Sequence, residues 1–91
     1  MNELERKKYL EDIKNNLTID QVYEFLTDMG GEPQIHHDVI ISRTICHNPP
    51  GHGSFKLYYY DNTKLFKCFT QCNDTFDIFE LTLKIKETAH E

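Results

Sequence analysis

Three cysteines bracket one short segment of this 91-residue chain, and their spacing constrains the fold more than any other feature. Cys46 precedes the segment together with His47 and His52, and Cys68 and Cys72 follow it. A protein-bound zinc ion takes four nitrogen or sulfur donors in a tetrahedron, often as two closely spaced pairs that a β-hairpin brings together. The pairs Cys46-x5-His52 and Cys68-x3-Cys72, with about 15 residues between them, meet this requirement. The sequence therefore predicts one structural zinc ion bound by Cys46, His52, Cys68 and Cys72.

The choice of histidine rests on the local backbone. His52 lies in a Gly-His-Gly turn that can carry its ring towards the sulfurs. His47 directly follows Cys46, and neighbouring side chains point to opposite sides where the chain is extended. We therefore favour His52 as the fourth ligand and keep His47 as the alternative.

Two other uses of the cysteines fit the pattern less well. A redox pair is typically Cys-x-x-Cys beside a βαβ unit, whereas Cys68 and Cys72 are separated by three residues and no such unit is predicted. A catalytic cysteine–histidine pair needs a third group to orient the histidine, and none stands out. Four protein ligands would also leave no open position for a substrate. We therefore predict no catalytic residue and no organic cofactor, and do not expect the chain to act as an enzyme alone.

The cysteine count also bears on the compartment. The first residues, MNELERKKYLED, are charged throughout and do not resemble a secretory signal peptide. No segment approaches the about 18 apolar residues of a membrane-spanning helix. An odd number of cysteines without an export signal favours thiols or metal ligands in a reducing compartment. We therefore expect a cytoplasmic protein without a membrane partner.

Helical patterns occur at both ends of the chain. A charged helix is expected over residues 3–15. A second helix begins at the capping-box residue Thr18 and ends at Gly30-Gly31, which supply a left-handed stop. A last helix is expected to follow a cap at Asp74 or Thr75.

The middle of the chain has the composition of strands. β-Branched and aromatic runs predict strands over 39–45, 54–60 and 64–70, the last two joined as a hairpin. The expected fold class is therefore α+β, a small zinc-ribbon-like antiparallel β-sheet with two N-terminal helices and one C-terminal helix.

The hairpin also carries the residues that could contact nucleic acid. The net charge is −5, yet residues 43–72 carry a formal charge of +3. Alternation places Lys56, Tyr58 and Tyr60 on one strand face, and Lys64 and Lys67 lie on the partner strand, where alternation can split them between faces. Aromatic rings stack on unpaired bases and lysines neutralise phosphates, so these five residues are candidates for binding single-stranded DNA. Packing tyrosines and solvated lysines are the competing interpretation.

The sequence also resembles a known family, the CHC2-type N-terminal zinc-binding domain of DnaG-like DNA primases. The likeness runs from about Leu10 to Ile85 and rests on LEDIKNNLTIDQVYEFL, ICHNPPGHGSF, KLFKCFTQC and DTFDIFELTLKI. The tyrosine run in FKLYYYDNTK is more like the versions carried by phages and mobile elements. Pro49 stands where that family carries its histidine, so the resemblance does not choose between His47 and His52.

The resemblance implies a function as well as a ligand set. Cys46, Cys68 and Cys72 match the family's three cysteines. The whole chain, 1–91, would be one primase-type zinc-binding domain, with a helical part over about 1–32, a zinc ribbon over about 38–72 and a helix over about 74–88. Such a domain would recognise the single-stranded template during primer synthesis in DNA replication. Polymerisation would belong to a separate catalytic domain. We expect the protein partner to be such a primase catalytic domain or a helicase.

A second function class is compatible with the same residues. The chain could be a zinc-stapled protein-interaction or regulatory module without direct DNA contact. In that case the acidic N-terminal helix, with Glu3, Glu5, Glu11 and Asp12, would contact the partner protein.

Overall fold

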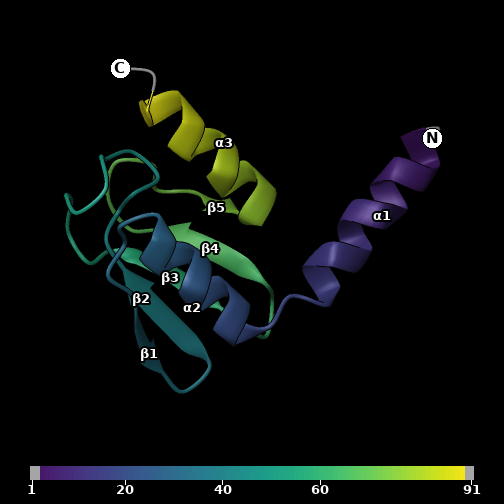
Figure 1. The fold of residues 1–91 in the computed structure, drawn as a ribbon, viewed down its shortest axis with the longest axis horizontal. Helices are drawn as coiled ribbons and strands as arrows, with labels where there is room; N and C mark the ends of the chain where they lie inside the picture. Colours follow the sequence, from purple (N-terminus) through teal and green to yellow (C-terminus); the bar gives the residue numbers. More distant parts are fainter. Residues whose placement is uncertain (1–2, 90–91) are drawn as a thin grey trace.

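The computed structural model describes residues 3–89, which form three helices and one five-stranded antiparallel sheet. Each strand pairs with the next along the chain, so the sheet order is β1-β2-β3-β4-β5 (Figure 1). The elements are α1 (Glu3–Asn15), α2 (Ile19–Asp28), β1 (Gln34–His36), β2 (Val39–Ser42), β3 (Leu57–Tyr60), β4 (Leu65–Cys68), β5 (Thr75–Phe76) and α3 (Ile78–Ala89). The predicted α+β class, with two helices before the sheet and one after it, is confirmed.

Helix α2 has the ends that its sequence predicts. The Thr18 hydroxyl accepts the Gln21 N–H and the Gln21 side chain accepts the Thr18 N–H, which completes a capping box. At the other end Gly30 has φ +79°, and the Gly31 N–H donates to the Leu26 carbonyl at 2.8 Å. This 6→1 bond, with the Gly30 N–H on Thr27, is a Schellman motif, and it turns the chain towards β1.

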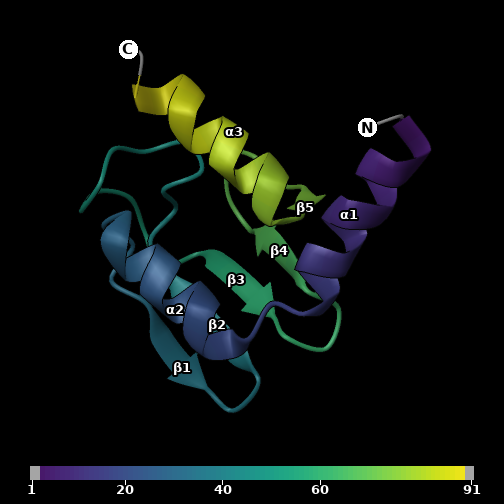
Figure 2. The ribbon, with the colours of Figure 1, turned by 45° about the vertical axis from the view of Figure 1, so that its right-hand side comes forward.

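The two faces of the sheet differ in what covers them. Side chains on the inner face are buried and pack with Val22 and Leu26 of α2 and Leu81 of α3. The inner-face residues of the core are Ile40, Leu57, Tyr59, Phe66, Cys68 and Phe76. Figure 2 shows α2 and α3 on the same side of the strands. Side chains alternate between the two faces along each strand, so Tyr58 and Tyr60 lie on the opposite face from Leu57 and Tyr59. We call this opposite face the outer face.

The C-terminal helix starts later than expected. Thr75 and Phe76 pair with β4 as the short strand β5, and α3 begins at Ile78 rather than after a cap at Asp74 or Thr75. Asp77 caps it instead, because its carboxylate accepts the Glu80 N–H at 2.9 Å while the Glu80 side chain accepts the Asp77 N–H.

Helix α1 stands apart from the core. None of its 13 residues is buried, and it projects away from α2 and α3 (Figure 1). An ion pair between Lys14 and Asp77, with a nitrogen–oxygen distance of 3.3 Å, links it to the start of α3. Among the described residues, no helix combines the length and apolarity needed to cross a membrane.

Candidate metal centre and sheet face

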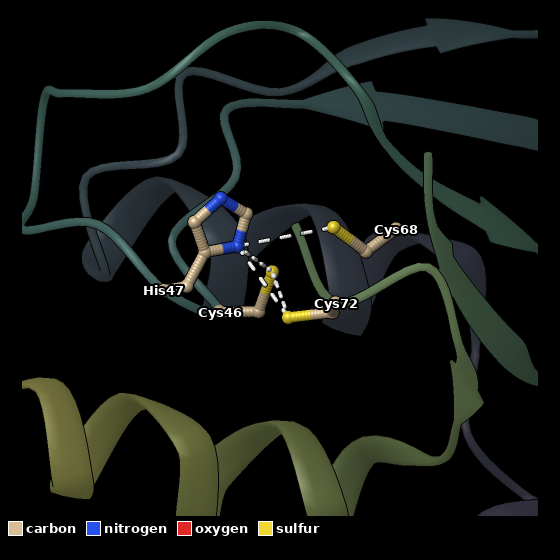
Figure 3. A group of neighbouring side chains, drawn as sticks. All are labelled: Cys46, His47, Cys68 and Cys72. Carbon is tan, nitrogen blue, oxygen red and sulfur yellow. Dashed lines mark hydrogen bonds between the residues drawn. The ribbon is translucent and has the colours of Figure 1, made fainter. Parts of the chain in front are cut away.

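Four side chains from two parts of the chain converge at one end of the sheet. The sulfurs of Cys46, Cys68 and Cys72 and a ring nitrogen of His47 all lie within 4.8 Å of one another. His47 Nδ1 is 3.2 Å from the Cys46 sulfur, 3.4 Å from that of Cys72 and 3.8 Å from that of Cys68. Figure 3 shows the ring with one nitrogen directed at the three sulfurs. The described residues therefore contain a Cys₃His group with the composition of a metal site.

The spacing of these atoms fits a zinc ion. Zinc bonds of about 2.3 Å to sulfur and 2.0–2.1 Å to nitrogen place tetrahedral ligands about 3.8 Å apart for two sulfurs and about 3.6 Å apart for sulfur and nitrogen. The Cys46 and Cys72 sulfurs are 3.6 Å apart, and the three sulfur–nitrogen distances span 3.2–3.8 Å. A disulfide would need a sulfur separation of about 2.05 Å, so these cysteines are free thiols. The donor set and these four distances suit a tetrahedral metal ion, and all four ligand atoms lie within 4.8 Å of one another.

The structure places His47 with the sulfurs and leaves His52 outside. Strand β2 ends at Ser42, and the chain then turns, with the His47 N–H donating to the Thr44 carbonyl at 3.2 Å. In such a turn the side chains of Cys46 and His47 no longer point to opposite sides as they would in a strand. His52 is exposed, and its N–H donates to Pro49 within its own loop. The geometry thus favours the alternative ligand over the one preferred from sequence.

The loop after His47 is fixed by close backbone contacts. The Asn48 side chain donates to the carbonyl and the hydroxyl of Thr44, at 3.1 and 2.9 Å. Gly53, with φ +92°, packs against both residues, and a Cβ placed on it would lie 2.4 Å from the Thr44 hydroxyl. A side chain at position 53 would therefore displace Thr44, which lies two residues before the candidate ligand Cys46.

A glycine pair in this loop offers a test of that rigidity. We expect Gly53→Ala to lower the free energy of unfolding by about 2–3 kcal/mol, because it adds a steric clash to the strain of a positive φ. Gly51→Ala is the matched control, since Gly51 has φ +77° but no atom within 4 Å of the added Cβ. Its cost should be about 1 kcal/mol. Urea unfolding of both variants measures the difference, and equal costs would show that the contact with Thr44 is not tight.

The ionisation of the four side chains is perturbed by burial and by their proximity to one another. Burial raises the pKa of Cys46, and the neighbouring charges of Cys68 and Cys72 raise it further. For Cys68, burial acts to raise the pKa, but hydrogen bonds from the side chain and backbone of Thr70 and from other groups outweigh it and lower the pKa to about 7. Burial and the positive charge of Lys84 lower the pKa of His47, which disfavours protonation of the ring. A cation would relieve the repulsion among the sulfurs and bind the neutral imidazole.

The outer face of the sheet carries aromatic rings next to this site. Tyr58 lies between Tyr60 and Phe69, with ring centroids 6.3 Å from the first and 5.0 Å from the second. Lys67 pairs with Tyr58 across β3 and β4, and its ammonium is 5.8 Å from the Phe69 ring centre. Phe69 is 49% exposed, and Lys56, just before β3, is exposed as well. Phe69 is not among the five candidates chosen from the sequence, but the structure groups it with these residues.

Lys64 does not join this face. It lies at φ +60° in the turn that closes the hairpin, and strand β4 begins only at Leu65. Its ammonium binds the Leu17 carbonyl and the Asp61 carboxylate, each at 2.8 Å. Lys64 thus makes an internal contact that links the α1–α2 junction to the hairpin. It is one of the five residues predicted to contact DNA.

Comparison with known proteins finds a relative encoded by a prophage. The chain is 45% identical over 82 residues to the SPbeta prophage-derived uncharacterized protein YorJ of Bacillus subtilis (strain 168). The match covers 87% of this chain and 21% of that protein, so the chain spans about a fifth of the length of the curated relative it matches. That relative is itself uncharacterized, so the likeness assigns no activity. No family model and no solved structure matches the chain.

Proposed function

We propose that this chain is a zinc-stapled module that binds single-stranded DNA as the template-recognition part of a DnaG-like primase or a related replication protein. The observation that carries the proposal is the group of rings and lysine on the outer face, Tyr58, Tyr60, Phe69 and Lys67. Tyr58 and Tyr60 lie on β3, Lys67 lies on β4, and Phe69 directly follows β4, the strand that ends at Cys68 and leads on to Cys72. A metal bound there would hold the rings in place.

The aromatic rings supply most of the expected affinity. Each base stacked on a ring contributes about 1–3 kcal/mol. Lys56 and Lys67 are the lysines of this face, and neutralising two phosphates of a single strand gives a salt slope of only about −1.4 in log–log form. A protein of net charge −5 gains little from long-range attraction, so stacking outweighs charge here.

The primase assignment rests on the sequence resemblance. KLFKCFTQC and the helix after it are similar to the corresponding parts of the CHC2 family. The likeness to a prophage protein agrees with the phage-type tyrosine run. We assign primer synthesis, the RNA polymerisation on a DNA template, to a polypeptide outside these residues, and we propose that a primase catalytic domain or a helicase is the partner that supplies or positions it.

Binding to a fluorescent single-stranded oligonucleotide, followed by anisotropy at low salt, tests the DNA part of the proposal. Phe69→Ala should weaken binding about 5- to 150-fold, the equivalent of one lost stacking contact. Lys67→Ala should reduce the salt slope by about 0.7. The matched controls are Tyr23→Ala, whose ring is 39% exposed on α2, and Lys86→Ala on α3, and neither should change binding. No binding at low salt, or equal effects of Phe69→Ala and Tyr23→Ala, would refute DNA recognition by this face.

One observation favours the protein-interaction function as a second candidate. Helix α1 buries none of its residues, and it exposes Leu4, Tyr9 and Ile13. Tyr9 and Ile13 lie one turn apart on the same face, and such an exposed apolar pair on a projecting helix suits a groove on a partner protein. Removal of residues 3–15 should then abolish co-purification with a helicase or primase catalytic domain and leave zinc and DNA binding intact. Co-purification that survives the deletion would exclude α1 as the contact.

A further inference from the structure

Thr70 touches two of the four candidate ligands from outside the group. Its hydroxyl oxygen is 3.4 Å from the Cys68 sulfur and 3.5 Å from His47 Nε2. The other ring nitrogen of His47, Nδ1, is the one that faces the three sulfurs. One exposed hydroxyl thus joins the far side of the imidazole to a ligating sulfur.

We propose that Thr70 is a positioning residue for the metal, which links His47 and Cys68 through a chain of two hydrogen bonds. His47 Nε2–H donates to the Thr70 hydroxyl oxygen, and the hydroxyl in turn donates to the Cys68 thiolate. A hydroxyl has one donor and two acceptor sites, so it can make both bonds at once. The proposal rests on the metal centre and is independent of DNA binding.

The direction of these bonds follows from what a metal requires. A metal bound at Nδ1 needs that nitrogen without a proton, so Nε2 must carry the single ring proton. A partner that accepts this proton fixes the tautomer and the ring orientation, which is the usual arrangement around metal-bound histidines. The thiolate accepts the remaining proton of the hydroxyl and spreads its negative charge. Each atom in these two hydrogen bonds therefore has the donor or acceptor role that metal binding requires of it.

Thr70 lies between the two cysteines of the second pair. Cys68 and Cys72 are separated by three residues, of which Thr70 is the middle one. Phe69 turns to the outer face, where its ring meets Tyr58, and Thr70 returns to the metal side. The pairing with His47 could not be read from sequence, because the two residues are 23 positions apart.

The test compares zinc affinities by competition with a coloured chelator at fixed pH. Thr70→Val removes the hydroxyl and keeps the shape, and it should weaken zinc binding about 10- to 100-fold, whereas Thr70→Ser should stay within about threefold of the parent. Thr63→Val is the control, because the Thr63 hydroxyl bonds only the Tyr60 carbonyl in the hairpin turn among the contacts described. In the cobalt-loaded protein, Thr70→Val should also shift the sulfur-to-metal charge-transfer band, since the Cys68 sulfur loses a hydrogen bond.

Two results would overturn the proposal. Zinc affinity unchanged by Thr70→Val would show that the hydroxyl is not used. Equal losses in Thr70→Val and Thr70→Ser would show that Thr70 acts through packing. Thr70→Ala serves as a second variant if the valine disturbs folding, and it should lose affinity as Thr70→Val does while Thr70→Ser retains it.

Discussion

Replacing Cys68 with serine is expected to abolish metal retention and to unfold most of residues 40–72. Cys68 is the last residue of β4, and its side chain is fully buried. Serine keeps the shape but offers a hard oxygen that zinc binds poorly in place of a thiolate. In small metal-binding domains the free energy of metal binding contributes directly to the free energy of folding. The free energy of unfolding should therefore fall by more than about 5 kcal/mol, which is comparable with the whole stability of a typical domain.

Thermal unfolding followed by circular dichroism checks this expectation. The parent protein treated with a strong chelator is the matched control, because it lacks the metal but keeps every side chain. Cys68→Ser and the chelated parent should unfold alike, and both far below the zinc-loaded parent. A Cys68→Ser variant that keeps both the zinc and the melting temperature of the parent would remove Cys68 from the ligand set.

His47→Ala should release zinc, and His52→Ala should not. His47 Nδ1 lies within 3.8 Å of all three sulfurs, whereas His52 is exposed in its loop. Groups that only orient a ligand are worth about 10- to 100-fold in metal affinity, so loss of the ligand itself should cost on the order of 100-fold or more. His52→Ala should remain close to the parent, since its ring takes no part in the group.

Chelator competition on the two variants decides between the histidines. The two substitutions remove the same side chain from the same loop region, so each is the control for the other. If His52→Ala released zinc and His47→Ala retained it, the loop would have to rearrange when the metal binds, and the ligand set described here would be wrong.

Sequence patterns with a local physical cause could be predicted well. The Thr18–Gln21 capping box and the Gly30 stop depend on residues within one helix, and both occur as expected. The alternation in β3 also holds, because Leu57 and Tyr59 are fully buried while Tyr58 and Tyr60 lie on the outer face. The three cysteines converge because the hairpin returns the chain to its starting point.

Features that depend on tertiary context could not be predicted. Strand β1 is exposed along its length and has no hydrophobic alternation, so only its pairing with β2 reveals it. The choice between His47 and His52 turned on where β2 ends, and this strand stops at Ser42, three residues before its composition suggested. Lys64 left the predicted DNA face because the turn places its ammonium beside Leu17, 47 positions away in sequence.

Metal analysis of the protein purified without chelator is the decisive measurement for a zinc ion bound by Cys46, His47, Cys68 and Cys72. We expect one zinc ion per chain, together with three thiols that react with a thiol reagent only after the zinc is removed. A folded protein with well under one zinc ion per chain, whose thiols react freely in the native state, would contradict it.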